Sequence, residues 1–186
     1  MNKNVNITKE TRKKLINSFW QLYKKKDLSK ITVGEICINA KYERTTFYRY
    51  FMDINDIINQ LEDDIINNIL NSIKSSNNVS TEISFYKFKK FIDKYGEYIV
   101  VFYEKGERCF YNKFKTLIKS NVYDYLNFNI HDEHKKEFLF EFMFSSLINS
   151  FVYWYRHQDI MKLESFVKLI NGMLLSVAKI VESYNK

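Results

Sequence analysis

Residues 44–51 combine guanidinium groups and hydroxyls with large aromatic rings, in the order Arg-Thr-Thr-Phe-Tyr-Arg-Tyr-Phe. Phe47 and Phe51 lie four residues apart, so both would face inward from a short helix. The side chains left to project outward are those of Arg44, Thr45, Tyr48 and Arg49. Hydroxyls bind phosphate oxygens, and arginine can form paired hydrogen bonds with guanine. The segment therefore predicts contact with DNA.

The residues on either side predict the elements that would position this segment. Thr32 precedes Glu35 by three residues, the spacing of a capping box at a helix start. The inward face of that helix would carry Val33, Ile36, Cys37 and Ala40. Residues 41–43, Lys-Tyr-Glu, would join it to a third helix that ends near Tyr50. This order is typical of a helix-turn-helix over about residues 33–52.

Longer helices are expected before and after this pair. A first helix would begin at Thr8 and run to about Lys26, with its core face at Leu15, Phe19 and Tyr23. Asp53 would cap a fourth helix of roughly 20 residues, or about 30 Å. We expect this fourth helix to link a small head to a larger body.

The rest of the chain also reads as helical. The sequence has no proline and four glycines, so long uninterrupted helices are favoured. Gly96 and Gly106 are the expected helix stops. Two long helices, at about 132–157 and 159–184, would follow. The prediction is an all-α protein of about nine helices.

The last two expected helices are apolar around most of their circumference. A helix that is apolar all round must be buried all round, so we expect these helices to pair with a second copy in a homodimer. The candidate interface side chains are Phe144, Phe151, Tyr155, Phe166, Ile170, Met173 and Val177. Aromatic residues between the middle helices could instead enclose a hydrophobic or aromatic ligand, although ordinary core is the simpler explanation. The candidate pocket side chains are Tyr86, Tyr98, Phe102, Phe110 and Phe114.

Positive charge is concentrated near the N-terminus. Residues 1–60 contain twelve Lys and Arg against six Asp and Glu, a net charge of +6 out of +7 for the whole chain. Such a face attracts a polyanion. Two alternatives stay open: a merely solvated surface, and a helical protein that binds anionic membrane surfaces.

Several kinds of chemistry find little support. Cys37 and Cys109 form no CxxC pair, so buried thiols are expected rather than a metal or redox site. His131 and His134 could belong to a metal site, but such residues at a helix start are more often caps. Adjacent carboxylates at residues 62–64 would not face one another on a helix. No phosphate loop or nucleophile elbow is present. We therefore expect no enzyme, no cofactor, no metal and no membrane span, and a cytoplasmic location.

Residues 8–68 resemble the TetR family of bacterial transcriptional regulators. The motifs that carry the resemblance are Ile31-Thr-Val-x-Glu-Ile, Thr46-Phe-Tyr-x-Tyr-Phe51, and Asp53 before the fourth helix. The resemblance implies a DNA-binding domain at 1–68 and a helical regulatory and dimerisation domain at 69–186. It also implies a homodimeric repressor that binds a pseudo-palindromic operator and is released by an effector. An activator controlled by a partner protein is the alternative.

The resemblance assigns roles to individual residues. It implies phosphate contacts for Thr32 and Tyr48 and a backbone approach for Thr46. Arg44, Thr45 and Arg49 would read the operator. The joint departs from the family's usual Gly-Val-Ser-like pattern. The full candidate DNA-binding set is Thr32, Lys41, Tyr42, Arg44, Thr45, Thr46, Tyr48 and Arg49.

Overall fold

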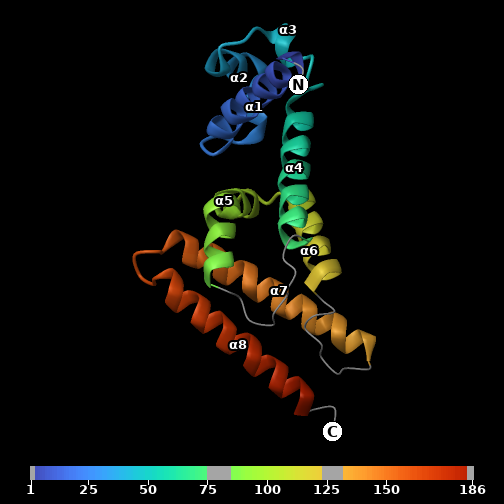
Figure 1. The fold of residues 1–186 in the computed structure, drawn as a ribbon, viewed down its shortest axis with the longest axis vertical. Coiled ribbons are helices and arrows are strands. Elements are labelled where there is room, and N and C mark those ends of the chain that lie inside the picture. Colours follow the sequence, from blue (N-terminus) through green and yellow to red (C-terminus); the bar gives the residue numbers. More distant parts are fainter. Residues whose placement is uncertain (1–2, 75–84, 123–131, 184–186) are drawn as a thin grey trace. The chain divides into compact units, whose positions relative to one another are not determined.

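The computed structural model describes residues 3–74, 85–122 and 132–183. Within these ranges the chain forms eight α-helices and no strand, which confirms the predicted all-α class (Figure 1). By internal packing it divides into an N-terminal unit (Met1–Asn67) and a C-terminal unit (Asn68–Lys186). The elements in chain order are α1 (Lys3–Tyr23), the 3-10 turn η1 (Leu28–Lys30), α2 (Val33–Ala40), α3 (Arg44–Phe47), α4 (Ile54–Lys74), α5 (Phe85–Glu104), α6 (Arg108–Val122), α7 (Glu133–Arg156) and α8 (Leu163–Ser183).

One face of α1 forms the core of the N-terminal unit. Leu15, Phe19 and Tyr23 are almost wholly buried, as their spacing predicted, and α1 packs against α2. The predicted start of this helix at Thr8 is wrong, because α1 already begins at Lys3. The residues before Thr8 include neither proline nor glycine, so nothing in them stops the helix from extending past a residue that could also serve as a cap.

Side-chain caps fix the starts of α2 and α4. Thr32 Oγ1 accepts a hydrogen bond from the Glu35 N–H at 3.2 Å, and the Glu35 carboxylate accepts one from the Thr32 N–H at 3.1 Å. This pair confirms the predicted capping box. Asp53 accepts a hydrogen bond from the Asp56 N–H at 2.8 Å, which confirms the predicted cap of α4. One cap precedes α3 in the sequence and the other follows it, so the helices before and after α3 both have fixed starting points.

α5 runs without a break through Gly96, so the prediction that Gly96 ends a helix is wrong. This accounts for the difference between the nine expected helices and the eight seen in the described ranges. A Cβ built at Gly96 would lie only 2.7 Å from Cε2 of Tyr155 on α7. Gly96 therefore permits close packing between two helices. Gly106, with a φ of 72°, does follow the end of α5 in the left-handed conformation.

Gly96→Ala is expected to destabilise the C-terminal unit by about 1–2 kcal/mol. Crowding against Tyr155 should outweigh the roughly 1 kcal/mol that alanine gains over glycine inside a helix. In a Tyr155→Ala background the same change should instead stabilise the unit, because the obstructing ring is absent. Urea unfolding of the four proteins gives the double-mutant cycle. Equal effects of Gly96→Ala in both backgrounds would contradict the packing explanation.

α7 and α8 lie side by side and run in opposite directions (Figure 1). The indole N–H of Trp154 donates a hydrogen bond to the Met161 carbonyl at 2.8 Å. The same indole stacks on Phe166, with ring centres 4.8 Å apart. These contacts close the turn between the helices. The turn takes up the first residues of the helix predicted at 159–184, so α8 begins later than predicted.

Candidate nucleic-acid interface

The candidate reading segment begins with a single turn of α-helix. α3 spans only Arg44–Phe47, and tighter turns follow where the sequence predicted helix as far as Tyr50. The Tyr50 N–H, for example, donates to the Phe47 carbonyl at 2.9 Å, a three-residue bond of the 3-10 type. Phe47 and Phe51 are buried as predicted, with ring centres 5.3 Å apart. These two rings attach the segment to the core.

The opposite side of the segment faces outward. Thr45, Tyr48 and Arg49 are exposed, while Thr46 is half-buried. The Tyr48 ring keeps 58% of its surface exposed even though its edge contacts Phe47 at 5.5 Å between ring centres. Arg49 has no ion-pair partner in the described part of the chain. The segment thus presents hydroxyls and a guanidinium group on a firmly anchored backbone.

The Arg44 side chain is exposed, but its guanidinium group turns back over α2. A Cβ built at Gly34 would lie 2.9 Å from Arg44 Nη2, so the group sits directly on the glycine. The positive charge of Arg44 also acts on the nearby thiol of Cys37. Burial raises the pKa of the Cys37 thiol, and the nearby Arg44 charge opposes that rise. Arg44 therefore lies against the first turn of α2, a place that sequence spacing could not indicate.

The joint between α2 and α3 depends on a left-handed residue. Lys41 has φ 59° and ψ 45°, a conformation that usually favours glycine. Its N–H donates a hydrogen bond to the Ile38 carbonyl, and its side chain is exposed to solvent. Tyr42 is half-buried, and its hydroxyl accepts a hydrogen bond from Thr11 Oγ1 at 3.4 Å. Tyr42 thus also ties the joint to α1.

The start of α2 carries an exposed hydroxyl beside a paired carboxylate. Thr32 is exposed, and Glu35 forms an ion pair with Lys26. The pKa of Glu35 lies below its ordinary value, first because Lys26 donates a hydrogen bond to the carboxylate and then because the Thr32 N–H does so. Lys26 offsets the negative charge that Glu35 would otherwise place near this helix end.

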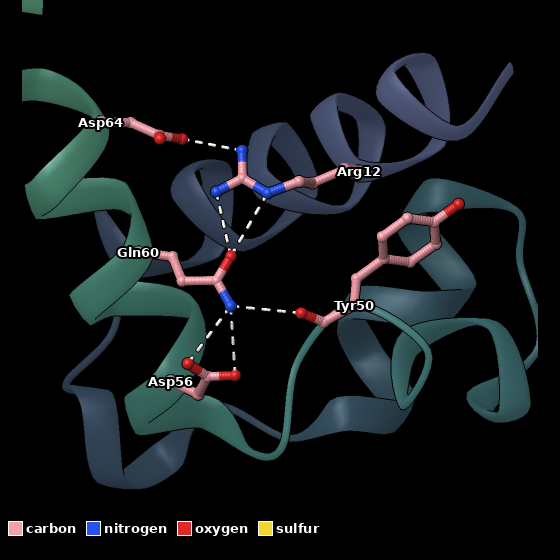
Figure 2. Close-up of polar contacts among 5 residues, drawn as sticks. All are labelled: Arg12, Tyr50, Asp56, Gln60 and Asp64. Atoms are coloured by element: carbon pink, nitrogen blue, oxygen red, sulfur yellow. Dashed lines mark hydrogen bonds and ion pairs between the residues drawn. The ribbon is translucent and has the colours of Figure 1, made fainter. Parts of the chain in front are cut away.

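A polar network connects α1, α4 and the chain after α3 (Figure 2). Arg12 of α1 forms an ion pair with Asp64 at 2.7 Å and hydrogen bonds with Gln60. Arg12 therefore does not add an unpaired charge to the basic N-terminal part of the chain. Sequence reasoning missed Gln60. The spacing of four between Asp56, Gln60 and Asp64 was the available signal, since it places all three on one face of a helix.

The five candidate pocket residues do not gather at one place. Tyr86 and Phe102 lie 16 residues apart in the continuous helix α5, a rise of about 24 Å. Tyr86 is exposed and carries Lys90 over its ring, whereas Phe102 is wholly buried and packs on Phe110 with ring centres 4.6 Å apart. Phe114 is also buried, and Tyr98 is half-buried with its pKa raised by burial. Phe102, Phe110 and Phe114 belong to a packed core.

Most candidate interface residues are also buried within this chain. The four with 7% or less of their surface exposed are Phe144, Phe151, Phe166 and Ile170. They pack inside the C-terminal unit, for example Phe144 against Tyr111 and Phe166 against Trp154. Tyr155 is half-buried against Gly96, and Val177 packs on a core cluster. Met173 alone among the seven is largely exposed. An apolar sequence pattern does not distinguish the core of one chain from a surface between chains.

The expected cap explains the histidine-containing segment before α7. His131 lies outside the described residues. Asp132 accepts hydrogen bonds from the N–H groups of His134 and Lys135 at 2.9 and 3.2 Å, and these bonds lower the pKa of its carboxyl. In the part of the chain that the structure covers, no group of three His, Cys, Asp or Glu side chains is arranged to hold a metal ion.

Sequence comparison gave no relative, since no protein-family model and no curated protein matches the chain. Solved structures do match. A TetR transcriptional regulator from Streptococcus agalactiae is 22% identical, with a TM-score of 0.69 over 92% of this chain and 97% of that one. A TetR-family regulator from Streptomyces coelicolor is 13% identical, with a TM-score of 0.67 over 95% and 85%. The dihydroxyacetone kinase operon activator DhaS is 17% identical, with a TM-score of 0.59 over 91% and 97%.

The chain has the TetR-family fold. The match extends over both units, because more than nine-tenths of the chain is covered in each of these comparisons. The segment expected to form a helix-turn-helix, residues 33–52, contains α2 and α3. None of the helices described here is long and apolar enough to cross a membrane.

Proposed function

We propose that this protein with the TetR-family fold is a DNA-binding regulator of transcription. The observation that carries the proposal is the exposed set of Thr45, Tyr48 and Arg49 above the buried pair Phe47 and Phe51. A protein that reads the major groove needs polar side chains that can form hydrogen bonds with base edges, and it needs a rigid backbone that holds those side chains in place. The net charge of +6 on residues 1–60 supports the proposal, because cations that replace condensed counterions provide much of the affinity for DNA.

The geometry suggests a division of roles within the interface. Thr45 and Arg49 are the best placed to reach base edges, since both are exposed on the outer side of the segment. Tyr48 and Thr32 would bind phosphates through their hydroxyls. We assign Arg44 to the phosphate backbone near α2 instead of to the bases, because its guanidinium group lies on Gly34. The half-buried Thr46 and Tyr42 and the exposed Lys41 would approach the backbone at the edges of this surface.

Arg49→Ala and Tyr48→Phe should weaken binding to the operator without changing the helical circular-dichroism signal. Loss of an arginine that reads a base costs about 1–3 kcal/mol, or roughly 5- to 150-fold in affinity. Loss of one phosphate contact by Tyr48→Phe should be smaller and similar for all sequences. Arg108→Ala and Tyr86→Phe make the same chemical changes at exposed sites of the C-terminal unit that lie outside the proposed dimer interface and should leave the affinity unchanged. Unaltered binding by both test variants would remove this segment as the reader.

The proposed regulator acts as a homodimer, with a revised interface on the outer faces of α7 and α8. Five large apolar side chains there keep between 45% and 74% of their surface exposed, namely Phe138, Phe142, Tyr153, Leu169 and Met173. They form one stripe on each helix, because residues four apart share a face and the eleven residues from Phe142 to Tyr153 make about three full turns. Exposed apolar patches of this kind mark interaction sites. A two-fold axis would bury both stripes against their copies and present two reading segments to half-sites about 34 Å apart or a small multiple of it.

We further propose that a hydrophobic or aromatic effector controls DNA release, with the protein acting as a repressor in the cytoplasm. An effector can do this only if its affinity differs between the DNA-competent and the released states. The alternative is an activator under the control of a partner protein. The structural similarity to DhaS, which is an operon activator, supports this alternative. A reporter gene placed behind the operator would separate the two, because deletion of a repressor raises expression and deletion of an activator lowers it.

A further inference from the structure

Gln60 of α4 uses both ends of its side-chain amide to join three parts of the N-terminal unit (Figure 2). Its oxygen, Oε1, accepts hydrogen bonds from Nε and Nη2 of Arg12 at 3.2 and 3.0 Å. Its nitrogen, Nε2, donates to the Tyr50 carbonyl at 3.2 Å and to the Asp56 carboxylate at 3.2 Å from each oxygen. A side-chain amide has one oxygen that accepts hydrogen bonds and two N–H groups that donate them. In Gln60 the oxygen and both N–H groups therefore have partners.

The two sides of this amide lead to different elements. On one side, Arg12 comes from α1, is held by Asp64 at 2.7 Å, and lies 5.9 Å from the centre of the Phe51 ring. On the other side, the Tyr50 carbonyl belongs to the chain that directly follows Arg49. Asp56 reinforces that side, because its carboxylate also accepts the Met52 N–H at 2.8 Å.

The segment that carries Tyr48 and Arg49 needs such support from outside. α3 has four residues, and a single helical turn is not stable by itself. Beyond α3 the chain continues only in turns before α4. The Tyr50 carbonyl, which ends this stretch, is held by Gln60. A hydrogen bond to a half-buried backbone group has a modest net value, but leaving such a group unsatisfied costs more.

We propose that Gln60 is a positioning residue for DNA recognition: it holds the backbone of residues 48–50 against α4, and Arg12 holds Gln60 in the required orientation. Gln60 itself does not touch DNA. It acts by fixing the direction in which Tyr48 and Arg49 leave the backbone, and a displacement of about 1 Å there is enough to impair recognition. The proposal rests on the proposed function, since the segment that Gln60 positions is the candidate reader.

The test uses Gln60→Glu in the full-length chain. A glutamate at this position can still accept hydrogen bonds from Arg12, but it cannot donate to the Tyr50 carbonyl, and it places a second negative charge against Asp56. The link to α1 is kept while the link to the reading segment is broken. Asn59→Asp is the matched control, because it makes the same amide-to-carboxylate change at the adjacent exposed position of α4. Gln60→Met, similar in size and uncharged, serves as the second variant if Gln60→Glu does not fold.

The expected result is operator affinity about tenfold weaker for Gln60→Glu, and within about twofold of the unmodified protein for Asn59→Asp. Binding is measured at a temperature where every variant is folded, so a purely stabilising role of Gln60 would leave the affinity unchanged. Amide NMR shifts of residues 48–52 should move in Gln60→Glu and in Gln60→Met, whereas those of α1 residues near Arg12 should move only in Gln60→Met.

Two results would overturn the proposal. One is equal operator affinity of Gln60→Glu and the unmodified protein, and the other is an equal loss of affinity in Asn59→Asp, which would attribute the effect to added charge. Failure of the proposed function looks different, because the unmodified protein itself would then bind no duplex specifically. In that case the NMR shifts of residues 48–52 still report whether Gln60 fixes this segment.

Discussion

Phe47→Ala is expected to lower the free energy of unfolding of the N-terminal unit by about 3–5 kcal/mol, the usual cost of removing a buried phenylalanine ring. Phe47 is wholly buried. Its ring contacts those of Phe51 and Tyr48, with centres 5.3 and 5.5 Å away. The cavity would form directly under the reading segment, so DNA binding should be lost together with stability. Urea unfolding followed by far-ultraviolet circular dichroism measures the first effect, and titration with operator DNA measures the second.

Ile38→Ala provides the matched control for Phe47→Ala. Ile38 is a large apolar residue of the same unit, but it keeps 77% of its surface exposed. Its truncation should therefore change the free energy of unfolding by no more than about 0.5 kcal/mol. If Phe47→Ala were as stable as Ile38→Ala and still bound DNA, the aromatic pair could not be what anchors the segment.

Met173→Asp should convert the proposed homodimer into monomers. Met173 lies on the exposed stripe of α8, and a carboxylate buried between two copies would lose its hydration without gaining a partner. Both copies would carry the charge, so the penalty is counted twice in a two-fold interface. Analytical ultracentrifugation at micromolar concentration would show the lower mass. Val177 is unsuitable for this test, because it packs on Leu139 and Met143 within the same chain.

Lys168→Asp is the control for the dimer experiment. Lys168 lies on the same helix and is exposed, where its ion pair with Glu164 contributes little. This variant receives the same new carboxylate at a position turned away from the stripe, and it should remain dimeric. An unmodified protein that sediments as a monomer at micromolar concentration would refute the interface proposal itself.

The sequence predicts well those features that depend on neighbouring residues. The capping box of Thr32 and Glu35 needs only a spacing of three residues, and it is present. The burial of Phe47 and Phe51 follows from a spacing of four on one helical face. The all-α class follows from the absence of proline and from periodicity along the chain. In the capping box and in the aromatic pair, the residues that determine the structure lie within about one helical turn of each other.

Features that depend on distant partners are not visible in the sequence. Gly96 looked like a helix stop, and only the ring of Tyr155, 59 residues away in the sequence numbering, explains it. Arg44 looked like an outward-facing reader, although its guanidinium group lies on Gly34 of another helix. The partners of Arg12, Gln60 and Asp64 of α4, lie about 50 residues away along the chain, and no local pattern points to them. The same holds for interface candidates such as Phe144, because a hydrophobic residue can be buried either within its own chain or against a second chain, and the sequence does not distinguish the two.

The central claim, that the segment after α2 reads DNA, is tested most directly by selecting bound duplexes from a random library with the full-length protein. We expect enrichment of one pseudo-palindrome whose half-sites lie about 34 Å or a small multiple apart, and loss of that enrichment in Arg49→Ala. Binding should weaken with added salt in proportion to the phosphates contacted. No enriched sequence, together with phosphatidylserine vesicles that compete equally with DNA at matched salt, would contradict the account and favour a surface that binds anions without reading them.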